Sequence, residues 1–205
     1  MSKKIILLLA MVWLTSSQFI TAQAFEEGQN NVSIGYGYEV FSVKKFFTTY
    51  EGYDDFTVTG FGPIVLKYEH GISDKIGFGL NVGYGTAKVS WTDSYLSTDE
   101  NGNDVTKTYT YDYKFNKITA QARLNWHLGD NDKLDPYLGF GIGYKSSKWT
   151  LETNDDFFDE LTFKGLPISM SASVGCRYYF TDNIGIFGEI GMGHGFMQGG
   201  LQIKF

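Results

Sequence analysis

The feature that most constrains the fold is a strict alternation of apolar side chains with glycine or small polar ones. Ile, Phe, Leu, Val and Tyr occupy every second position from 76 to 84, for example, with Gly or Asn between them. A period of two indicates β-strands, whose successive side chains point to opposite faces. The clearest runs cover residues 32–40, 76–85, 118–128, 138–144, 168–180, 184–193 and 197–205. A weaker run over 57–70 contains Pro63, where we expect a bulge. The pattern predicts eight strands.

The two faces of these strands predict which side meets lipid. One face carries Ile, Leu, Val, Phe and Tyr, and the other mostly Gly, Ser, Asn and Gln. A soluble all-β barrel would turn its apolar face inward, whereas a transmembrane barrel turns it outward. A small barrel has little internal space, so the glycine-rich face suits the inside. We therefore predict an all-β fold, an eight-stranded antiparallel up-and-down transmembrane β-barrel.

The N-terminal segment has the features of a signal peptide over residues 1–24. Lys3 and Lys4 precede an apolar run over residues 5–14, and Ala22 and Ala24 form a small-x-small cleavage site. The alternative, an uncleaved membrane anchor, is disfavoured because the apolar run is too short to span a bilayer. We expect the barrel domain to cover residues 25–205.

Connections between the runs alternate in length. Residues 71–75, 129–136 and 181–183 form short turns, whereas 43–56, 92–108 and 152–161 are long or strongly polar. Outer-membrane barrels have short periplasmic turns and longer outer loops, and an even strand count puts both termini in the periplasm. Aromatic residues near strand ends predict two interfacial girdles. These are Tyr68, Trp126, Tyr137, Tyr178, Phe180 and Phe205 near the short turns, and Phe41, Tyr84, Trp91, Tyr144 and Trp149 toward the loops.

The C-terminal thirty residues resemble a known family. The segment 176–185, Cys-Arg-Tyr-Tyr-Phe-Thr-Asp-Asn-Ile-Gly, is similar to the penultimate hairpin of outer-membrane β-barrel-domain proteins of Bacteroidetes. The end of the chain resembles their closing strand, with Leu201, Ile203 and Phe205 matching the signal read by the barrel assembly machinery. The resemblance implies an eight-stranded barrel like the OmpA and OmpX transmembrane domains, in the outer membrane of a Gram-negative bacterium. Its implied partners are that machinery, membrane lipids and lipopolysaccharide.

Charged residues of both signs fall on the inward face of the predicted strands. They are Glu39, Lys67, Glu69, Lys117, Arg123, Arg177, Glu189 and Lys204, with His127 nearby. Such a set can line a narrow pore for small solutes or ions. We favour a paired network that plugs the lumen, because unpaired charge in a narrow space is costly and eight strands leave room only for side chains.

Negative charge dominates the rest of the chain. The formal net charge of −6 becomes −8 when the two lysines of the signal are removed, which argues against nucleic acid as a partner. Acidic residues concentrate in two predicted outer loops, at Asp93, Asp99, Glu100 and Asp104, and at Glu152, Asp155, Asp156, Asp159 and Glu160. An extracellular ligand or a divalent cation is a candidate partner there. A solvated loop is the simpler interpretation, and we predict no metal site.

No catalytic set is evident in the sequence. Enzymes of the lipid A deacylase kind place His and Ser two residues apart on a late strand, but here Phe196 follows His194. Cys176 is the single cysteine, so no disulfide forms within the chain. We predict no catalysis and no cofactor, and a structural or interaction role in envelope integrity, adhesion or ligand binding. The alternatives are a narrow porin-like channel and a lipid-modifying outer-membrane enzyme.

Overall fold

Eight strands close a ring. The computed structural model describes residues 23–38, 54–98, 101–155 and 161–205. In this part of the chain all strand pairings are antiparallel, and the ring runs β1–β2–β3–β4–β5–β7–β8–β9. Pairing of β1 with β9 closes it, from Asn31 opposite Lys204 to Tyr38 opposite Met197. The strands are β1 Asn30–Tyr38, β2 Asp54–Ser73, β3 Ile76–Thr98, β4 Asp104–His127, β5 Leu134–Thr153, β6 Leu161–Lys164, β7 Ile168–Tyr179, β8 Ile184–Met192 and β9 Met197–Lys204.

The short strand β6 lies outside the ring of eight. It pairs with residues 148–151 of β5, on the same edge of β5 whose residues 134–144 pair with β7. The predicted eight-stranded up-and-down barrel is therefore confirmed, and β6 is an addition that the sequence did not predict.

The barrel carries its apolar side chains on the outside. Leu80, Ile142, Val174 and Leu201 are each more than half exposed, and they belong to a belt that continues around the ring. The buried side chains are mostly polar or charged. An exposed apolar surface of this extent marks contact with a membrane or a partner. The predicted outward apolar face is confirmed, and the soluble barrel with apolar residues inside is excluded.

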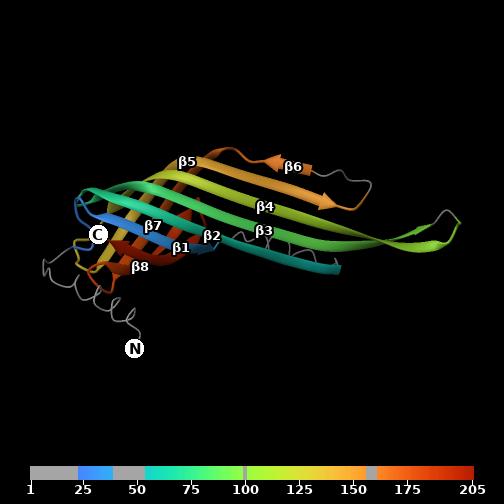
Figure 1. Ribbon diagram of the computed structural model, residues 1–205, viewed down its shortest axis with the longest axis horizontal. Helices are drawn as coiled ribbons and strands as arrows, with labels where there is room; N and C mark the ends of the chain where they lie inside the picture. The colour runs from blue at the N-terminus through green and yellow to red at the C-terminus, as the bar shows by residue number, and fades with distance from the viewer. Residues whose placement is uncertain (1–22, 39–53, 99–100, 156–160) are drawn as a thin grey trace, which may run out of the picture.

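The two ends of the barrel differ in length. At one end, which we call the turn end, short connections join the strands, and Phe205 lies there beside Asn30. At the other end, the loop end, β2, β3, β4 and β5 run on well past β1, β7, β8 and β9 (Figure 1). The strand β4 has 24 residues, against 8–12 for those four shorter strands. About 9–11 residues suffice to cross the hydrocarbon layer. The excess extends roughly 40 Å beyond it at about 3.4 Å per residue.

This extension corrects the predicted limits of several loops. The expected loop over residues 92–108 is mostly a continuous ladder of β3 and β4, which ends with Thr98 opposite Asp104. We call residues 54–61, 86–98, 104–116, 146–153 and 161–164 the projecting sheet. Its sequence lacks the alternation of apolar and polar side chains because neither face of this sheet meets lipid. The expected turns 71–75 and 129–136 are also shorter, since β2 ends at Ser73 and β5 begins at Leu134. The described residues contain no helix long and apolar enough to cross a membrane.

A bulge interrupts β2 as expected. The register with β3 shifts between Phe61 and Ile64, around Pro63, so the predicted irregularity at Pro63 is confirmed. Below it, alternation resumes, with Val65 fully buried on the inner face. An apolar residue at an inward position is what weakened this run in the sequence.

One of the predicted interfacial aromatics is inside the barrel. Tyr137 is 1% exposed and points into the lumen, so its placement in a membrane girdle was wrong. Gly175 lies opposite Tyr137, and a Cβ at Gly175 would fall 2.4 Å from the Tyr137 ring. The missing side chain makes room for the ring. The expected girdle residues Trp91 and Trp149 lie in the projecting sheet beyond the apolar belt, so their placement was also wrong, and Phe41 lies outside the described residues.

Candidate functional site

The inside of the barrel is filled by a set of interacting charged and aromatic side chains, which we call the lumen network. Its members are Lys67, Glu69, Arg123, His127, Asp135, Tyr137, Arg177 and Glu189. They come from β2, β4, β5, β7 and β8, whose alternation turns these positions inward. All eight are below 9% exposed.

Glu189 on β8 is the first hub of the network. Its carboxylate accepts hydrogen bonds from Arg123 at 2.7 and 3.2 Å and from the Tyr137 hydroxyl at 2.7 Å. Lys67 Nζ lies 2.8 Å from the same carboxylate, and Gln198 donates to it at 2.6 Å. One carboxylate therefore interacts with two buried cations, which come from β2 and β4 on either side of β3.

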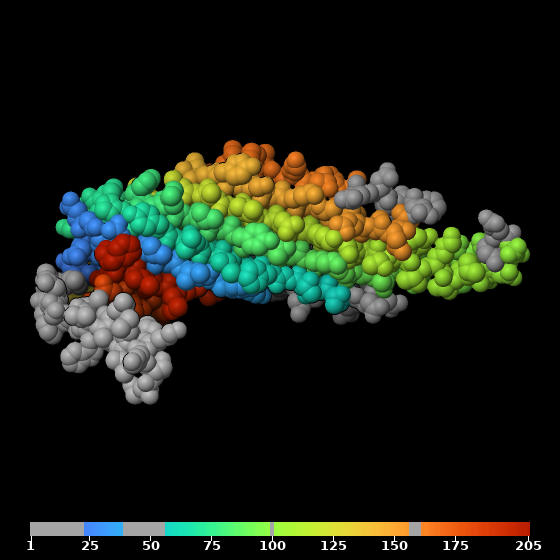
Figure 2. Space-filling model, in the orientation of Figure 1, coloured from blue at the N-terminus to red at the C-terminus, as the bar shows by residue number. Residues whose placement is uncertain are grey.

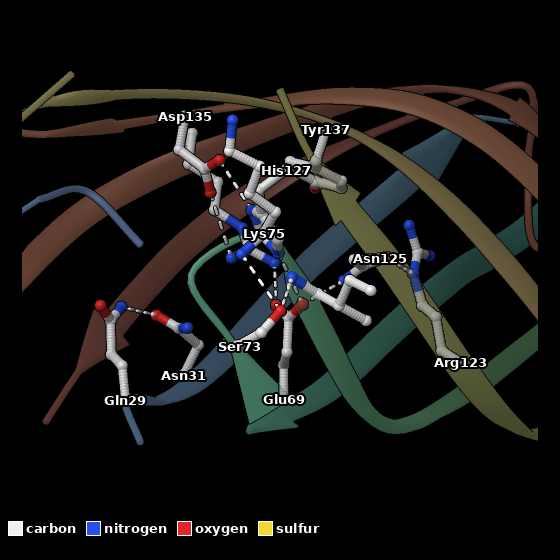
Figure 3. A network of polar contacts seen from close by, with 12 residues as sticks. Gln29, Asn31, Glu69, Ser73, Lys75, Arg123, Asn125, His127, Asp135 and Tyr137 are labelled. Atoms are coloured by element: carbon white, nitrogen blue, oxygen red, sulfur yellow. Dashed lines mark hydrogen bonds and ion pairs between the residues drawn. The ribbon is translucent and has the colours of Figure 1, made fainter. Parts of the chain in front are cut away.

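Glu69 on β2 is the second hub. It accepts hydrogen bonds from Arg177 and, at 2.7 Å, from Asn125. His127 Nε2 lies 3.0 Å from Glu69 and His127 Nδ1 lies 2.7 Å from Asp135, which also pairs with Arg177 at 3.3 Å. Figure 3 shows Asn125 and His127 beside Glu69, with Asp135 on the far side of the His127 ring. The imidazole is held between two carboxylates, so its orientation is set by both.

The charges of the lumen network balance. Lys67, Arg123 and Arg177 provide three cations, and Glu69, Asp135 and Glu189 provide three anions. The space among them is a cavity of about 10 Å³, lined in part by Asn31, Ser33 and Gly79 besides the charged groups. That volume is at the lower limit for a single water molecule, roughly 10–15 Å³. The geometry is that of a plug rather than a water-filled passage.

Residues preceding β1 cap the network at the turn end. The Phe25 ring stacks on His127 with ring centroids 3.4 Å apart and an angle of 7° between the planes, and Phe25 is 4% exposed. Gly28 donates its N–H to the Gly71 carbonyl, and Gly71 donates its N–H to the Gln29 carbonyl. A second polar layer, in which Tyr179 donates to Asn31 at 2.9 Å, lies beside this cap.

The remaining predicted inward residues lie at the two ends of the lumen. The Lys204 ammonium lies 4.6 Å from the centroid of the Tyr179 ring near the turn end, and Lys117 donates to the Gly193 carbonyl at 3.2 Å toward the loop end. Glu39 lies outside the described residues, as does Ala22 of the predicted cleavage site. Leu201, Ile203 and Phe205 lie on the lipid-facing side of the closing strand or at its end, each at least half exposed.

Sequence reasoning missed several network members. Asp135 and Tyr137 were assigned to a turn and to a girdle, although both have the inward parity of Gly139 and Gly141 on the same strand. His194, which the sequence suggested only as half of a missing catalytic pair, is 2% exposed, with Nδ1 2.8 Å from Thr119 and Nε2 2.7 Å from Gln121. Extending the parity of the run 138–144 by three residues toward the N-terminus would have found the first two, but nothing in the sequence points His194 inward.

Three acidic residues in or beside the projecting sheet have protein partners. Asp93 accepts from the Tyr95 hydroxyl at 2.6 Å, and Glu152 pairs with Lys114 at 2.5 Å. Asp155 accepts from Tyr111 at 2.8 Å, and burial with this hydrogen bond raises the pKa of the Tyr111 phenol. Among the described residues no group of three or more His, Cys, Asp or Glu side chains is placed to hold a metal ion. The expected loop acids Asp99, Glu100, Asp156, Asp159 and Glu160 lie outside the described residues.

Asp112 forms a further ion pair in this sheet. Lys88 Nζ lies 2.9 Å from its carboxylate, and Ser90 donates to it at 2.7 Å. Partial burial opposes ionisation of Asp112, but the hydrogen bonds from Lys88 and Ser90 outweigh it and lower its pKa below the ordinary 3.8.

Comparison with known proteins gives similar barrels at low identity. No protein-family model and no curated protein matches the chain. The N-terminal β-barrel domain of Pseudomonas aeruginosa OprF is 14% identical over 88% of this chain and 99% of that one, with a TM-score of 0.43. The outer membrane protein OprG of the same organism is 13% identical over 91% and 99%, at 0.46. Ail of Yersinia pestis, solved with the heparin analogue sucrose octasulfate, is 14% identical over 87% and 99%, at 0.39. The predicted barrel fold is confirmed by the closed ring of eight antiparallel strands in this chain itself.

Proposed function

We propose that the protein is an outer-membrane barrel whose lumen is closed and whose projecting sheet makes contacts outside the cell. In this proposal residues 1–24 are a cleaved signal peptide, both termini lie in the periplasm, and the loop end faces outward. The short turns and the unequal strand lengths support this orientation. Lipids and lipopolysaccharide surround the belt, and the barrel assembly machinery inserts the chain.

The observation that carries the proposal is the projecting sheet. Four strands of 20 to 24 residues continue past the belt, which is more than a transmembrane anchor needs. The ladder between β3 and β4 is unbroken to Thr98 and Asp104, so the sheet holds a surface away from the membrane. Figure 2 shows this part of β3 and β4 standing clear of the barrel. A rigid surface at a distance suits binding of a partner more than passage of a solute.

The lumen network argues against the channel alternative, and the set of buried groups argues against catalysis. Each buried carboxylate of the network is paired with cations that hold it. The nearest described polar partners of His194 are Thr119 and Gln121, which form no nucleophile–base–acid set with it. We therefore propose a protein without a catalytic role or cofactor, which acts through its outer surface in adhesion or ligand binding.

A trimmed variant tests the proposal. Thr92 and Thr110 lie opposite each other, so joining them through an Asn-Gly turn removes the tip of the projecting sheet and leaves the barrel unchanged. Cells displaying the parent chain are expected to adhere to an array of immobilised glycans and matrix proteins, and cells with the trimmed variant to lose that adhesion. Both proteins should keep a heat-dependent shift on gels. Equal adhesion of parent and trimmed cells would contradict the role of the sheet.

Two further measurements address orientation and the alternatives. Protease added to intact cells should cut within residues 98–104 and leave an N-terminal epitope of the mature chain untouched. In planar bilayers the parent should show no steady conductance, and lipid A from a deletion strain should have an unchanged mass spectrum. Stable open-channel currents would support the pore, and an altered lipid profile would support an enzyme.

A further inference from the structure

Two exposed lysines lie opposite each other where the projecting sheet leaves the apolar belt. Lys148 of β5 pairs with Lys164 of β6, so both side chains are on the same face of the sheet. That face continues the outside of the barrel, because Lys148 has the parity of the exposed residues Ile142 and Tyr144. Residues directly opposite each other in antiparallel strands have Cβ atoms about 4.5–5.5 Å apart, and like charges in such a pair are destabilising.

No acidic side chain of the described residues offsets this pair. Neither ammonium forms an ion pair or a side-chain hydrogen bond within the part of the chain that the structure describes. The residues beside the pair on the same face are polar and uncharged or apolar, namely Asn116, Ser146, Thr150, Thr162 and Leu166. The two positive charges therefore face solvent together.

A neighbouring pair of lysines shows how the same sheet offsets such a repulsion elsewhere. Lys88 of β3 lies opposite Lys114 of β4, on the next rung toward the tip. Lys88 is 2.9 Å from the Asp112 carboxylate, and Lys114 is 2.5 Å from the Glu152 carboxylate. Since acids accompany this pair, their absence beside Lys148 and Lys164 points to an anion supplied from outside the chain.

Exposed apolar side chains lie between the lysine pair and the rest of the belt. Tyr144 on β5 is 57% exposed, and Leu166 and Ile168 are 77% and 61% exposed. Ile168 lies opposite Tyr144, so these side chains are next to each other. Tyr144 is about 13 Å from Lys148 along the strand, at about 3.4 Å per residue, and lysine stems lie along apolar surface with the charged end in the polar layer. The pair is therefore at the level of lipid head groups.

We propose that Lys148 and Lys164 bind the phosphate of a lipid with several acyl chains, of the lipid A class. A phosphate monoester carries a charge of about −1.5 to −2 at pH 7, which matches two ammonium groups, and lysine binds phosphate as a point charge. The acyl chains lie against Tyr144 and Ile168, and only the head group reaches the projecting sheet. The inference rests on the proposed function, because this end of the belt meets the outer leaflet only if the loop end faces outward.

Native mass spectrometry of the refolded barrel in detergent micelles, titrated with bisphosphorylated lipid A, tests the site. The parent should bind this lipid at least about tenfold more tightly than lipid A without phosphates, which has the same acyl chains. The double variant K148Q/K164Q should lose about the same factor for lipid A and none for the phosphate-free lipid. Equal affinity of the parent for the two lipids, or an unaltered double variant, would overturn the site. Displacement of lipid A by inorganic phosphate would show a site for the free ion and overturn the lipid.

The double variant K107Q/K133Q is the matched control. It also removes two exposed lysines, one on β4 near the tip of the projecting sheet and one before β5 at the turn end. Both double variants should keep the gel shift of a folded barrel. If K107Q/K133Q weakens lipid A binding as much as K148Q/K164Q does, overall charge accounts for the binding and the proposal fails.

Failure of this site and failure of the proposed function give different results. Binding in micelles does not depend on how the barrel is oriented in a cell, so loss of lysine dependence contradicts the phosphate site alone. Lysine-dependent binding together with protection of residues 98–104 from protease on intact cells would overturn the proposed orientation and support the phosphate site.

Discussion

Replacing Glu189 by Gln should destabilise the barrel far more than removing an exposed carboxylate does. The substitution keeps the shape of the side chain and one acceptor oxygen, but it removes the negative charge that faces Lys67 at 2.8 Å and Arg123 at 2.7 Å. Both cations have side chains no more than 10% exposed, so water cannot replace the lost anion. The lumen network then holds three cations and two anions.

The size of the effect follows from two independent routes. Removing one partner of a buried ion pair costs about 3–5 kcal/mol. Two charge-assisted hydrogen bonds of about 1.5–3 kcal/mol each give a similar range. At about 1.4 kcal/mol per factor of ten, the folded-to-unfolded ratio should fall by roughly two to three and a half orders of magnitude.

Urea titration of the barrel in lipid vesicles, with the gel shift as readout, measures this change. Glu152→Gln is the matched control, because its partner Lys114 is also at hydrogen-bond distance but the side chains are 38% and 45% exposed. That variant should lose at most about 1 kcal/mol. If E189Q does not refold, the double variant K67M/E189Q should, since it removes a cation with the anion. A free energy of unfolding for E189Q that lies within about 0.5 kcal/mol of the parent value, or that equals the value for E152Q, would refute the reasoning.

Three further predictions concern other parts of the molecule. Phe25→Ala should loosen the cap at the turn end and speed amide hydrogen exchange at Gly28 and Gly71 by about tenfold. The amides of β3 and β4 should keep their protection. Unchanged exchange at Gly28 and Gly71 would contradict a packed cap. The pKa of Asp112 is lowered in the folded state, so its contribution to the stability of the projecting sheet is complete above pH 3.8 and is lost as the pH falls through the folded-state pKa. Carboxyl NMR titration measures that pKa. If the Ser90→Ala variant gives the same Asp112 titration curve as the parent, the hydrogen bond from Ser90 does not lower the pKa. Phe205→Ala should refold normally in vesicles yet reach lower levels in the outer membrane; normal levels in cells would exclude an assembly signal.

Much of the barrel follows from local alternation. A strand period of two sets which side chain faces lipid and which faces the lumen, and both environments leave a strong mark on composition. That is why Lys67, Arg123 and Glu189 were expected on the inner face, where the structure places them. It is also why the strand count could be read without any pairing information.

The pairings within the lumen could not be predicted in this way. Glu69 meets Arg177 across 108 residues, because the stagger of the ring brings β2 and β7 to the same level. Parity gives the side of a strand but not the height at which its side chains meet those of a distant strand. The prediction missed the projecting sheet for a different reason. Outside the membrane, a strand no longer needs the alternation of apolar and polar side chains by which it was recognised.

The closure of the ring by β1 and β9 has a consequence for how the chain becomes folded. Ser33 and Gln202, joined by a hydrogen bond, are 169 residues apart, so the seam forms only after the last strand has been synthesised. Before that moment each intermediate has two unpaired edges and an uncovered apolar surface, which are the features of aggregating species. Contacts of such long sequence separation also make folding slow. Until the seam closes, contact between copies of the chain therefore carries a risk of aggregation.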